Sequence, residues 1–436
     1  MIEHVHNPPI DHVIDPPLAE RFGRSWWAGI GLSLLGVLLL LYSLGGPAFT
    51  GIGVWGTTIP YVWGFDLASY AWWIGIANGA ALFAAILVLI GNSLRTAINR
   101  FAIGLAFGAA ICAAIFPVFH LGRPWLAYWM IPYPTAQGLW PQFRSPLTWD
   151  FWNILIYVTV IALLWYVGLI PDLATLRDRA TKRRRQLLYG LFALGWRGSA
   201  RQWALHQRAH RIVALTLIPL LFVAQTIVSF ETVGSLVPAW HETREPLHYV
   251  ASGFLSGLAM VLLIALLLRT RLGLHHHIDE RDIDLLGRLL LASALILAYL
   301  HAAGWFTAWL GEEGLRAALW TRMTGSYWPF YWSGLVLAVL PPQLFWWRRL
   351  RGSTIAGVAA ALLVLAGIYL DHLSIIVAGL QRGHLATSAA LYSPTLAEAS
   401  LLAGTIGLFA LMVLLSVRRL PIVSLYETRA EGLGKS

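Results

Sequence analysis

Three ionisable side chains in this chain of 436 residues stand at the ends of long apolar segments: His120, Asp150 and Glu231. An imidazole and carboxyl groups are what proteins use to accept and pass protons near neutral pH. Each residue taken alone is explained as a solvated helix end. Three such ends in consecutive segments favour a shared site instead, because an ionisable group in apolar surroundings is costly.

Four further ionisable residues accompany them. Asp66 precedes an earlier apolar segment, and Arg123 follows His120 in FPVFHLGRPWLAYW at 116–129 as a candidate counter-ion. Asp371 and His372 lie together in YLDHLSII near the end of a later segment. Arg123 and the tryptophans around it also suit plain interface anchoring, so His120 is the residue of that stretch with the strongest case for chemistry.

The composition identifies the elements that must position these groups. The chain is 58% hydrophobic and 12% charged, with a mean hydropathy of +0.66, whereas soluble domains carry about 25% charged residues. Apolar runs of about 20 residues recur, which is the length that crosses a bilayer. We therefore expect an all-α integral membrane protein with ten transmembrane helices. Their predicted ranges are 28–46, 68–92, 102–120, 149–171, 212–230, 247–270, 288–310, 327–347, 354–378 and 396–417.

The positive charges predict the orientation. Most of the 31 Lys and Arg residues fall in the even-numbered loops and the two tails, which places both termini in the cytoplasm of a bacterial inner membrane. The net charge of +10 is thus assigned to lipid headgroups and topology rather than to nucleic acid. The basic loop 172–211 is expected to lie as an amphipathic helix on anionic lipid.

Short similarities predict an internal duplication. Gly75 and Gly79 match Gly253 and Gly257, and His120 matches His301, at separations of about 180 residues. Units four helices apart have the same orientation, so the two four-helix bundles would form a parallel repeat. The predicted parts are a cytoplasmic N-terminal tail at 1–27, a first helix and outer loop at 28–67, a first bundle with the site at 68–231, a second bundle at 232–378, and a last helix with a cytoplasmic tail at 379–436.

Resident redox groups are not expected in this chain. The single cysteine, Cys112, excludes an intrachain disulfide, a Cys-ligated iron–sulfur cluster and a c-type haem attachment. His120, His301 and His372 are the histidines assigned to spans, one per helix and all in the outer half, which argues against a b-type haem. The run LHHHIDERDID at 274–284 is not expected to bind a metal, because adjacent helical residues point in different directions.

A carboxylate and an imidazole at the apolar edge of a membrane suit the oxidation of a hydroquinone. That reaction needs acceptors for two phenolic protons and a slot for an isoprenoid tail. The protons would leave on the outer side, and the electrons would pass to a partner subunit docked on the outer face.

Longer motifs resemble the NrfD/PsrC family of quinone-handling membrane subunits, and most closely its ActC branch, a subunit of alternative complex III. The resemblance is carried by HLGRPW at 120–125, PYPTAQGLWPQFRSPLTWDFWNI at 132–154, YVGLIPDLATLRDRA at 166–180, ALGWRGSARQW at 193–203, SLVPAWH at 235–241 and GFLSGLAMVL at 253–262.

The resemblance implies a menaquinol-type substrate at the periplasmic side. By motif, His120 and Asp150 match the family's quinol-site residues, and Glu231 stands where the branch usually has Asp. It also implies a partner iron–sulfur subunit, multihaem c-type cytochrome subunits, a second NrfD-like membrane subunit, and lipid, with no nucleic acid. Proton translocation is a further expectation, with Asp371, His372, His301 and Asp66 as candidate path residues.

Two other interpretations remain open. The same fold could be the membrane anchor of a polysulfide- or sulfoxide-type molybdoenzyme reductase. A secondary transporter is the third, but transporters place broken helices and charges at midplane, whereas the acids here gather at one end.

Overall fold

The structure, a computed structural model, describes residues 23–58, 60–91, 93–131, 146–234, 237, 240, 242–381 and 391–425. Within these residues the regular elements are all helices, and nine of them are long and apolar enough to cross a membrane. The nine are α2 (Arg24–Phe49), α3 (Phe65–Ile90), α4 (Ser93–His120), α5 (Pro146–Arg179), α7 (Ala200–Val233), α8 (Glu245–Arg271), α9 (Glu280–Leu310), α13 (Thr354–Leu380) and α14 (Leu396–Arg419).

The eighth predicted span is broken. Instead of one helix over 327–347, the chain forms α11 (Trp328–Val339) and then a 3-10 segment, η5 (Pro341–Trp346). Pro341 and Pro342 cause the break, because proline lacks the backbone N–H that continues an α-helix and crowds the preceding turn.

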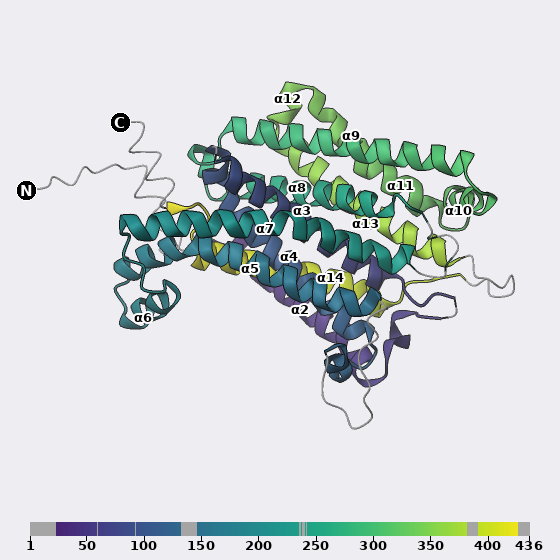
Figure 1. Cartoon of the computed structure of the whole chain (residues 1–436), viewed down its shortest axis with the longest axis horizontal. Coiled ribbons are helices and arrows are strands. Elements are labelled where there is room, and N and C mark those ends of the chain that lie inside the picture. The colour runs from purple at the N-terminus through teal and green to yellow at the C-terminus, as the bar shows by residue number, and fades with distance from the viewer. Residues whose placement is uncertain are drawn as a thin grey trace, which may run out of the picture.

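Much of the basic region 172–211, which was expected to form an amphipathic helix on the lipid surface, instead extends the two neighbouring membrane helices. α5 extends to Arg179, a short α6 spans Arg183–Phe192, and α7 begins at Ala200 with a capping box in which Ser199 and Gln202 exchange hydrogen bonds. α6 lies at one end of the molecule and α10 (Glu313–Thr324) at the other (Figure 1).

The helices pack in two rings. In the first, α3 contacts α4 and α7, and α5 completes the ring by contacting α4 and α7. In the second, α8 contacts α9 and α13, and α11 completes it by contacting both. Going around each ring, the helices follow one another in the order of the chain. That the two rings are related by an axis along the membrane normal stays a prediction. α2 and α14 pack mainly on each other, beside the rings.

Glycines make the contact between the rings. A Cβ atom on Gly79 would overlap the carbonyl oxygen of Gly253, and one on Gly257 would overlap the backbone at Gly79 and Ala80. α3 and α8 therefore cross with their backbones in direct contact, which the predicted small-residue motifs allow.

Candidate functional site

The polar residues predicted from sequence gather at one end of the first ring. Asp66 begins α3, His120 ends α4, Asp150 lies in the first turns of α5 and Glu231 lies near the end of α7. All four side chains are buried or nearly so. We call this end of the molecule the carboxylate end, and the opposite one, where α8 finishes at Arg271 and α14 at Arg419, the arginine end.

Asp66 orients His120. The Nδ1 atom of His120 lies 3.2 Å from Oδ2 of Asp66, and the Asp66 carboxylate also accepts the backbone N–H of Gly64 at 2.8 Å. Nε2 of His120 is buried and has no hydrogen-bond partner among the residues that the structure describes. If Nδ1 carries the proton that Asp66 accepts, Nε2 presents a lone pair, which is the form that can accept a proton from a substrate hydroxyl.

A second set of contacts joins Tyr70, Asp150 and Glu231. The Tyr70 hydroxyl donates to Oδ1 of Asp150 at 2.6 Å, and the carboxyl groups of Asp150 and Glu231 are hydrogen-bonded to each other. A hydrogen bond between two carboxyl groups requires a proton on one of them. One oxygen of Glu231, Oε1, and the hydroxyl of Tyr157 are buried without hydrogen-bond partners in the described part of the chain.

The two sets are adjacent. Tyr70 lies one helical turn after Asp66, and its ring packs on Phe116, whose ring centroid is 6.2 Å from that of His120. Trp55 also packs against His120, with ring centroids 6.0 Å apart. The result is a proton-accepting group with aromatic walls, which is the surrounding that an aromatic ring with two hydroxyls requires.

Arg123 does not join this cluster. Its residue is exposed, and among the described residues it forms no ion pair with Asp150 or Glu231. The predicted counter-ion role therefore has no support in the geometry. The motif residues at 132–145 lie outside the described part of the chain.

A second buried cluster occupies the other ring. His248 of α8 binds Oδ2 of Asp371 through Nε2 at 2.7 Å, and His301 of α9 lies 3.8 Å from Oδ1. His372 lies 3.3 Å from the Ser252 hydroxyl. The structure thus brings the predicted His301, Asp371 and His372 together, but not with Asp66, which belongs to the first ring.

Sequence reasoning missed His248. It stands four residues into α8 and is fully buried, so the set of histidines assigned to spans was incomplete. The internal repeat contains a signal that could have found it, since His248 stands in α8 where Tyr70 stands in α3. His210 is a second addition, because α7 begins twelve residues earlier than predicted.

Ligand atoms of His248, His301 and Asp371 lie within 4.8 Å of one another, close enough to share one metal ion. The sequence led us to expect no metal in this chain. Nε2 of His248 is hydrogen-bonded to Asp371, whereas within the described part of the chain Nδ1 of His248 and both ring nitrogens of His301 are buried without hydrogen-bond partners.

A polar path connects the two clusters. The Tyr249 hydroxyl is hydrogen-bonded to Thr232, the residue after Glu231, and the Tyr249 ring stacks on that of His372 with centroids 5.0 Å apart. Nearby, Asn78 donates to Gln225 at 2.6 Å, and Gln225 donates to the carbonyl of Tyr249 at 3.1 Å. Buried polar groups therefore run from one ring to the other.

Two packed rings of apolar helices, each holding buried ionisable groups, define an all-α integral membrane protein. The family model described as "Polysulphide reductase, NrfD" matches residues 53–383. The chain belongs to this NrfD family. It is also 24% identical over 438 residues to a protein of Halobacterium salinarum that is named as a membrane subunit of a dimethyl sulfoxide reductase, with 94% of this chain and 95% of the relative covered. The chain is a membrane subunit of a family of redox enzyme complexes.

Proposed function

We propose that this protein is the quinol-oxidising membrane subunit of a respiratory oxidoreductase. The observation that carries the proposal is the pairing of Asp66 with His120 beside the Tyr70–Asp150–Glu231 set, because it supplies acceptors for two protons at one end of an apolar bundle.

In this proposal the residues divide the work. Nε2 of His120 accepts one phenolic proton, and the shared carboxyl pair of Asp150 and Glu231 accepts the other. The phenolic group of Tyr70 donates a hydrogen bond to the carboxyl group of Asp150 and holds it in place. The quinol supplies the two electrons, which pass to a partner subunit at the carboxylate end, and this end faces the outside of a bacterial inner membrane.

For the complex, the comparisons favour the anchor of a polysulfide- or sulfoxide-type reductase, in which a molybdoenzyme partner receives the electrons. A second candidate is alternative complex III with its iron–sulfur and multihaem subunits. The motifs HLGRPW and SPLTWD favour it, since they resemble the ActC branch. Purification of the chain with its native partners, followed by molybdenum analysis and c-type haem absorbance, distinguishes the two.

The site itself is tested by quinol oxidation in the purified complex. Asp150→Asn keeps the size and polarity of the side chain but removes the proton acceptor, so we expect a fall of kcat/KM of about 100-fold. Asp178→Asn is the matched control, because Asp178 lies exposed at the opposite end of the same helix. Wild-type turnover in Asp150→Asn would contradict the site.

We further propose that Thr232, Tyr249 and His372 carry protons from the first ring toward Asp371. Turnover-linked proton movement in proteoliposomes with a pH-sensitive dye tests this path. Asp371→Asn should lower the number of protons moved for each quinol oxidised while quinol oxidation continues. An unchanged proton ratio would contradict the path.

A further inference from the structure

A large groove lies away from both polar clusters. It separates the α2–α14 pair from helices α8 and α13 and has a volume of about 1110 Å³. Its floor contains Trp72 and Trp73, and its rim contains the exposed side chains Leu32, Leu267 and Leu362. Apolar walls of this extent, open at the rim in a membrane-spanning chain, are surroundings for hydrocarbon rather than water.

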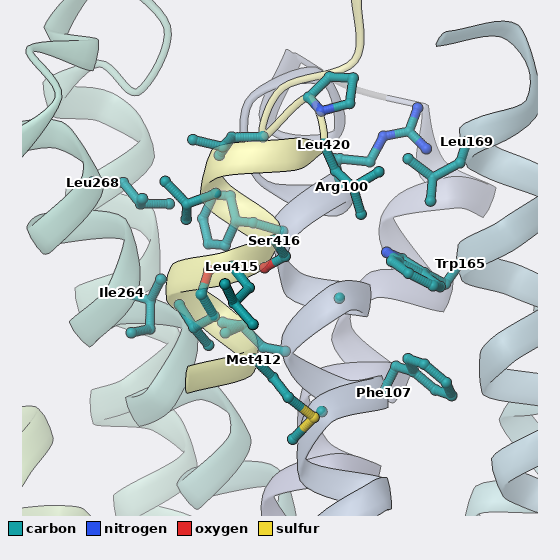
Figure 2. Close-up of a pocket in the computed structure, with 18 of the residues that line it drawn as sticks. Arg100, Phe107, Trp165, Leu169, Ile264, Leu268, Met412, Leu415, Ser416 and Leu420 are labelled. Carbon is teal, nitrogen blue, oxygen red and sulfur yellow. Dashed lines mark hydrogen bonds between the residues drawn. The ribbon is translucent and has the colours of Figure 1, made fainter. Parts of the chain in front are cut away.

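The groove continues around α14. A smaller cavity of about 260 Å³ lies between α14 and helices α4 and α5, and the two cavities share Ile264 and Leu268 of α8 and Val413 and Val417 of α14. Figure 2 shows Ile264 and Leu268 on one side of α14 and Phe107 and Trp165 on the other. The last turns of α14 therefore stand between two apolar spaces instead of packing closely on the rings.

The mouth of the groove is cationic. Arg271, the last residue of α8, lines the mouth, is exposed, and has no acidic partner among the residues that the structure describes. Gly23 and Ser25 line the same mouth at the start of α2, where no side chain of the described residues caps the helix. A helix N-terminus without a cap leaves backbone N–H groups for an anion, and it adds to the charge of Arg271.

An arginine also packs on the wall of the groove beside the mouth. Arg418 of α14 lies over the ring of Trp26, 4.7 Å from its centroid, and Trp26 lines the groove. Arginine and tryptophan at this depth belong to the headgroup region of a bilayer. The groove thus has a headgroup end and a hydrocarbon end, in the order that a phospholipid requires.

We propose that this groove is a binding site for an anionic phospholipid. Its acyl chains lie along the apolar walls of α2, α8, α13 and α14, and its phosphate is bound by Arg271 and the backbone N–H groups that begin α2. A zwitterionic lipid fills the walls equally well but gains less at the mouth, so the site is selective for negative headgroups.

The experiment uses the full chain with its partner subunits, reconstituted in phosphatidylcholine nanodiscs. Each sample contains a small fraction of photoactivatable phosphatidylglycerol or, in parallel, photoactivatable phosphatidylcholine. Labelled peptides are then mapped. We expect phosphatidylglycerol to label peptides of α2, α8 and α13 about fivefold more than phosphatidylcholine, the contribution of about one arginine near a charged surface.

Two variants and one control complete the design. Arg271→Ala should reduce phosphatidylglycerol labelling about fivefold, to the level of phosphatidylcholine. Ala366→Trp, which fills the exposed position of α13 inside the groove, should reduce the labelling by both lipids. Arg281→Ala is the control, because Arg281 is exposed at the same end of the molecule but does not line the groove.

Four results would overturn the proposal. Equal labelling by the two lipids, or unchanged labelling in Arg271→Ala, would exclude a selective site. An equal loss in Arg281→Ala would reduce the effect to general surface charge. Labelling confined to a partner subunit would show that a protein helix covers the groove.

Discussion

At the scale of single residues, the contact between Asp66 and His120 predicts how substitutions of the two residues combine in the kinetics of quinol oxidation. Asp66 contacts Nδ1 of His120, and Nε2 remains the atom available to a substrate. Asp66 therefore acts through His120, as a positioning residue. The two residues form one functional unit, and the effects of changing units of this kind are not additive.

We predict that Asp66→Asn lowers kcat/KM for quinol oxidation by about tenfold and His120→Ala by about 100-fold. The double variant Asp66→Asn/His120→Ala should be no slower than His120→Ala alone. Steady-state kinetics of the three purified complexes provides the measurement. If the two losses multiply in the double variant, Asp66 does not act through His120.

A different residue-scale prediction concerns Glu242, in the segment before α8. Its carboxylate forms ion pairs with Arg244 and, at 3.5 Å, with Arg322. Burial would raise the pKa of Glu242, but the Arg322 and Arg244 guanidiniums outweigh it and hold the pKa below its usual range. A lowered carboxyl pKa stabilises the fold above the unfolded-state pKa of about 4.3, and the gain is lost as pH falls through the folded-state pKa.

Glu242→Gln should therefore destabilise the protein by about 3 kcal/mol near pH 7, because it removes the carboxylate that pairs with Arg244 and leaves Arg322 paired with Glu245, at 3.6 Å. Thermal unfolding in detergent is measured from pH 7 to pH 3. The difference in Tm between wild type and variant should stay constant down to about pH 5 and then shrink. A difference that is independent of pH would assign the effect to packing.

The sequence predicted the candidate site better than its surroundings. Residue types and the ends of hydropathy segments were enough to place His120, Asp150 and Glu231 at one end. They could not identify Tyr70 as the partner of Asp150, because a tyrosine inside an apolar run looks like ordinary core. His248 was missed for a related reason, since hydropathy finds a helix but does not tell which side chains meet inside it.

At the scale of elements, the crossing of α3 and α8 depends on hydrogen as the only side chain at Gly79 and Gly257. A methyl group at either position overlaps backbone atoms of the facing helix, which cannot rotate away as a side chain can. Gly31 of α2 is a matched control, since a Cβ atom there has no atom of another described element within 4 Å.

We predict that Gly79→Ala and Gly257→Ala each lower stability by about 2 kcal/mol, within the range for overpacked positions. Gly31→Ala should be neutral or slightly stabilising, because alanine favours a helix by about 1 kcal/mol over glycine. Thermal unfolding of the three variants is the measurement. Equal effects at all three positions would mean that the backbones do not meet as described.

Helix ends show where sequence reasoning failed at this scale. A hydropathy window stops at charged residues, so α7 was predicted to begin at 212, whereas the polar turns before it are helical and capped by Ser199. For the eighth span the prediction was too long, because one helix was expected over 327–347 and the chain forms two shorter segments there. Its composition is apolar throughout, and only the steric demand of Pro341 and Pro342 divides it.

At the scale of the whole molecule, the carboxylate end also presents an aromatic surface. Trp125 and Trp129 lie in η2 (Pro124–Met130), directly after His120, and are 59% and 51% exposed. Exposed tryptophans next to the proposed oxidation site suit the docking of the subunit that receives the electrons, because aromatic anchors contribute much of the energy at interfaces.

We predict that Trp125→Ala and Trp129→Ala each weaken binding of the partner subunit about tenfold, with little change in the Tm of this chain. Partner retention during affinity purification at increasing dilution provides the measurement. Trp309→Ala is the control, since Trp309 is 71% exposed at the end of α9 in the other ring. Equal partner retention in all three variants would locate the interface elsewhere.

Quinol oxidation with outward proton release further requires that the carboxylate end faces away from the cytoplasm. Opposite ends of α9 test this, because Arg281 lies exposed at its start and Glu312 lies exposed just after its end. The single native cysteine, Cys112, is fully buried and leaves the background low. A membrane-impermeant maleimide should label Glu312→Cys in intact spheroplasts and Arg281→Cys only after permeabilisation, since arginine-rich ends remain in the cytoplasm. The reverse pattern would place Asp150 and His120 on the cytoplasmic side. Quinol oxidation would then release its protons into the cytoplasm, which contradicts outward proton release.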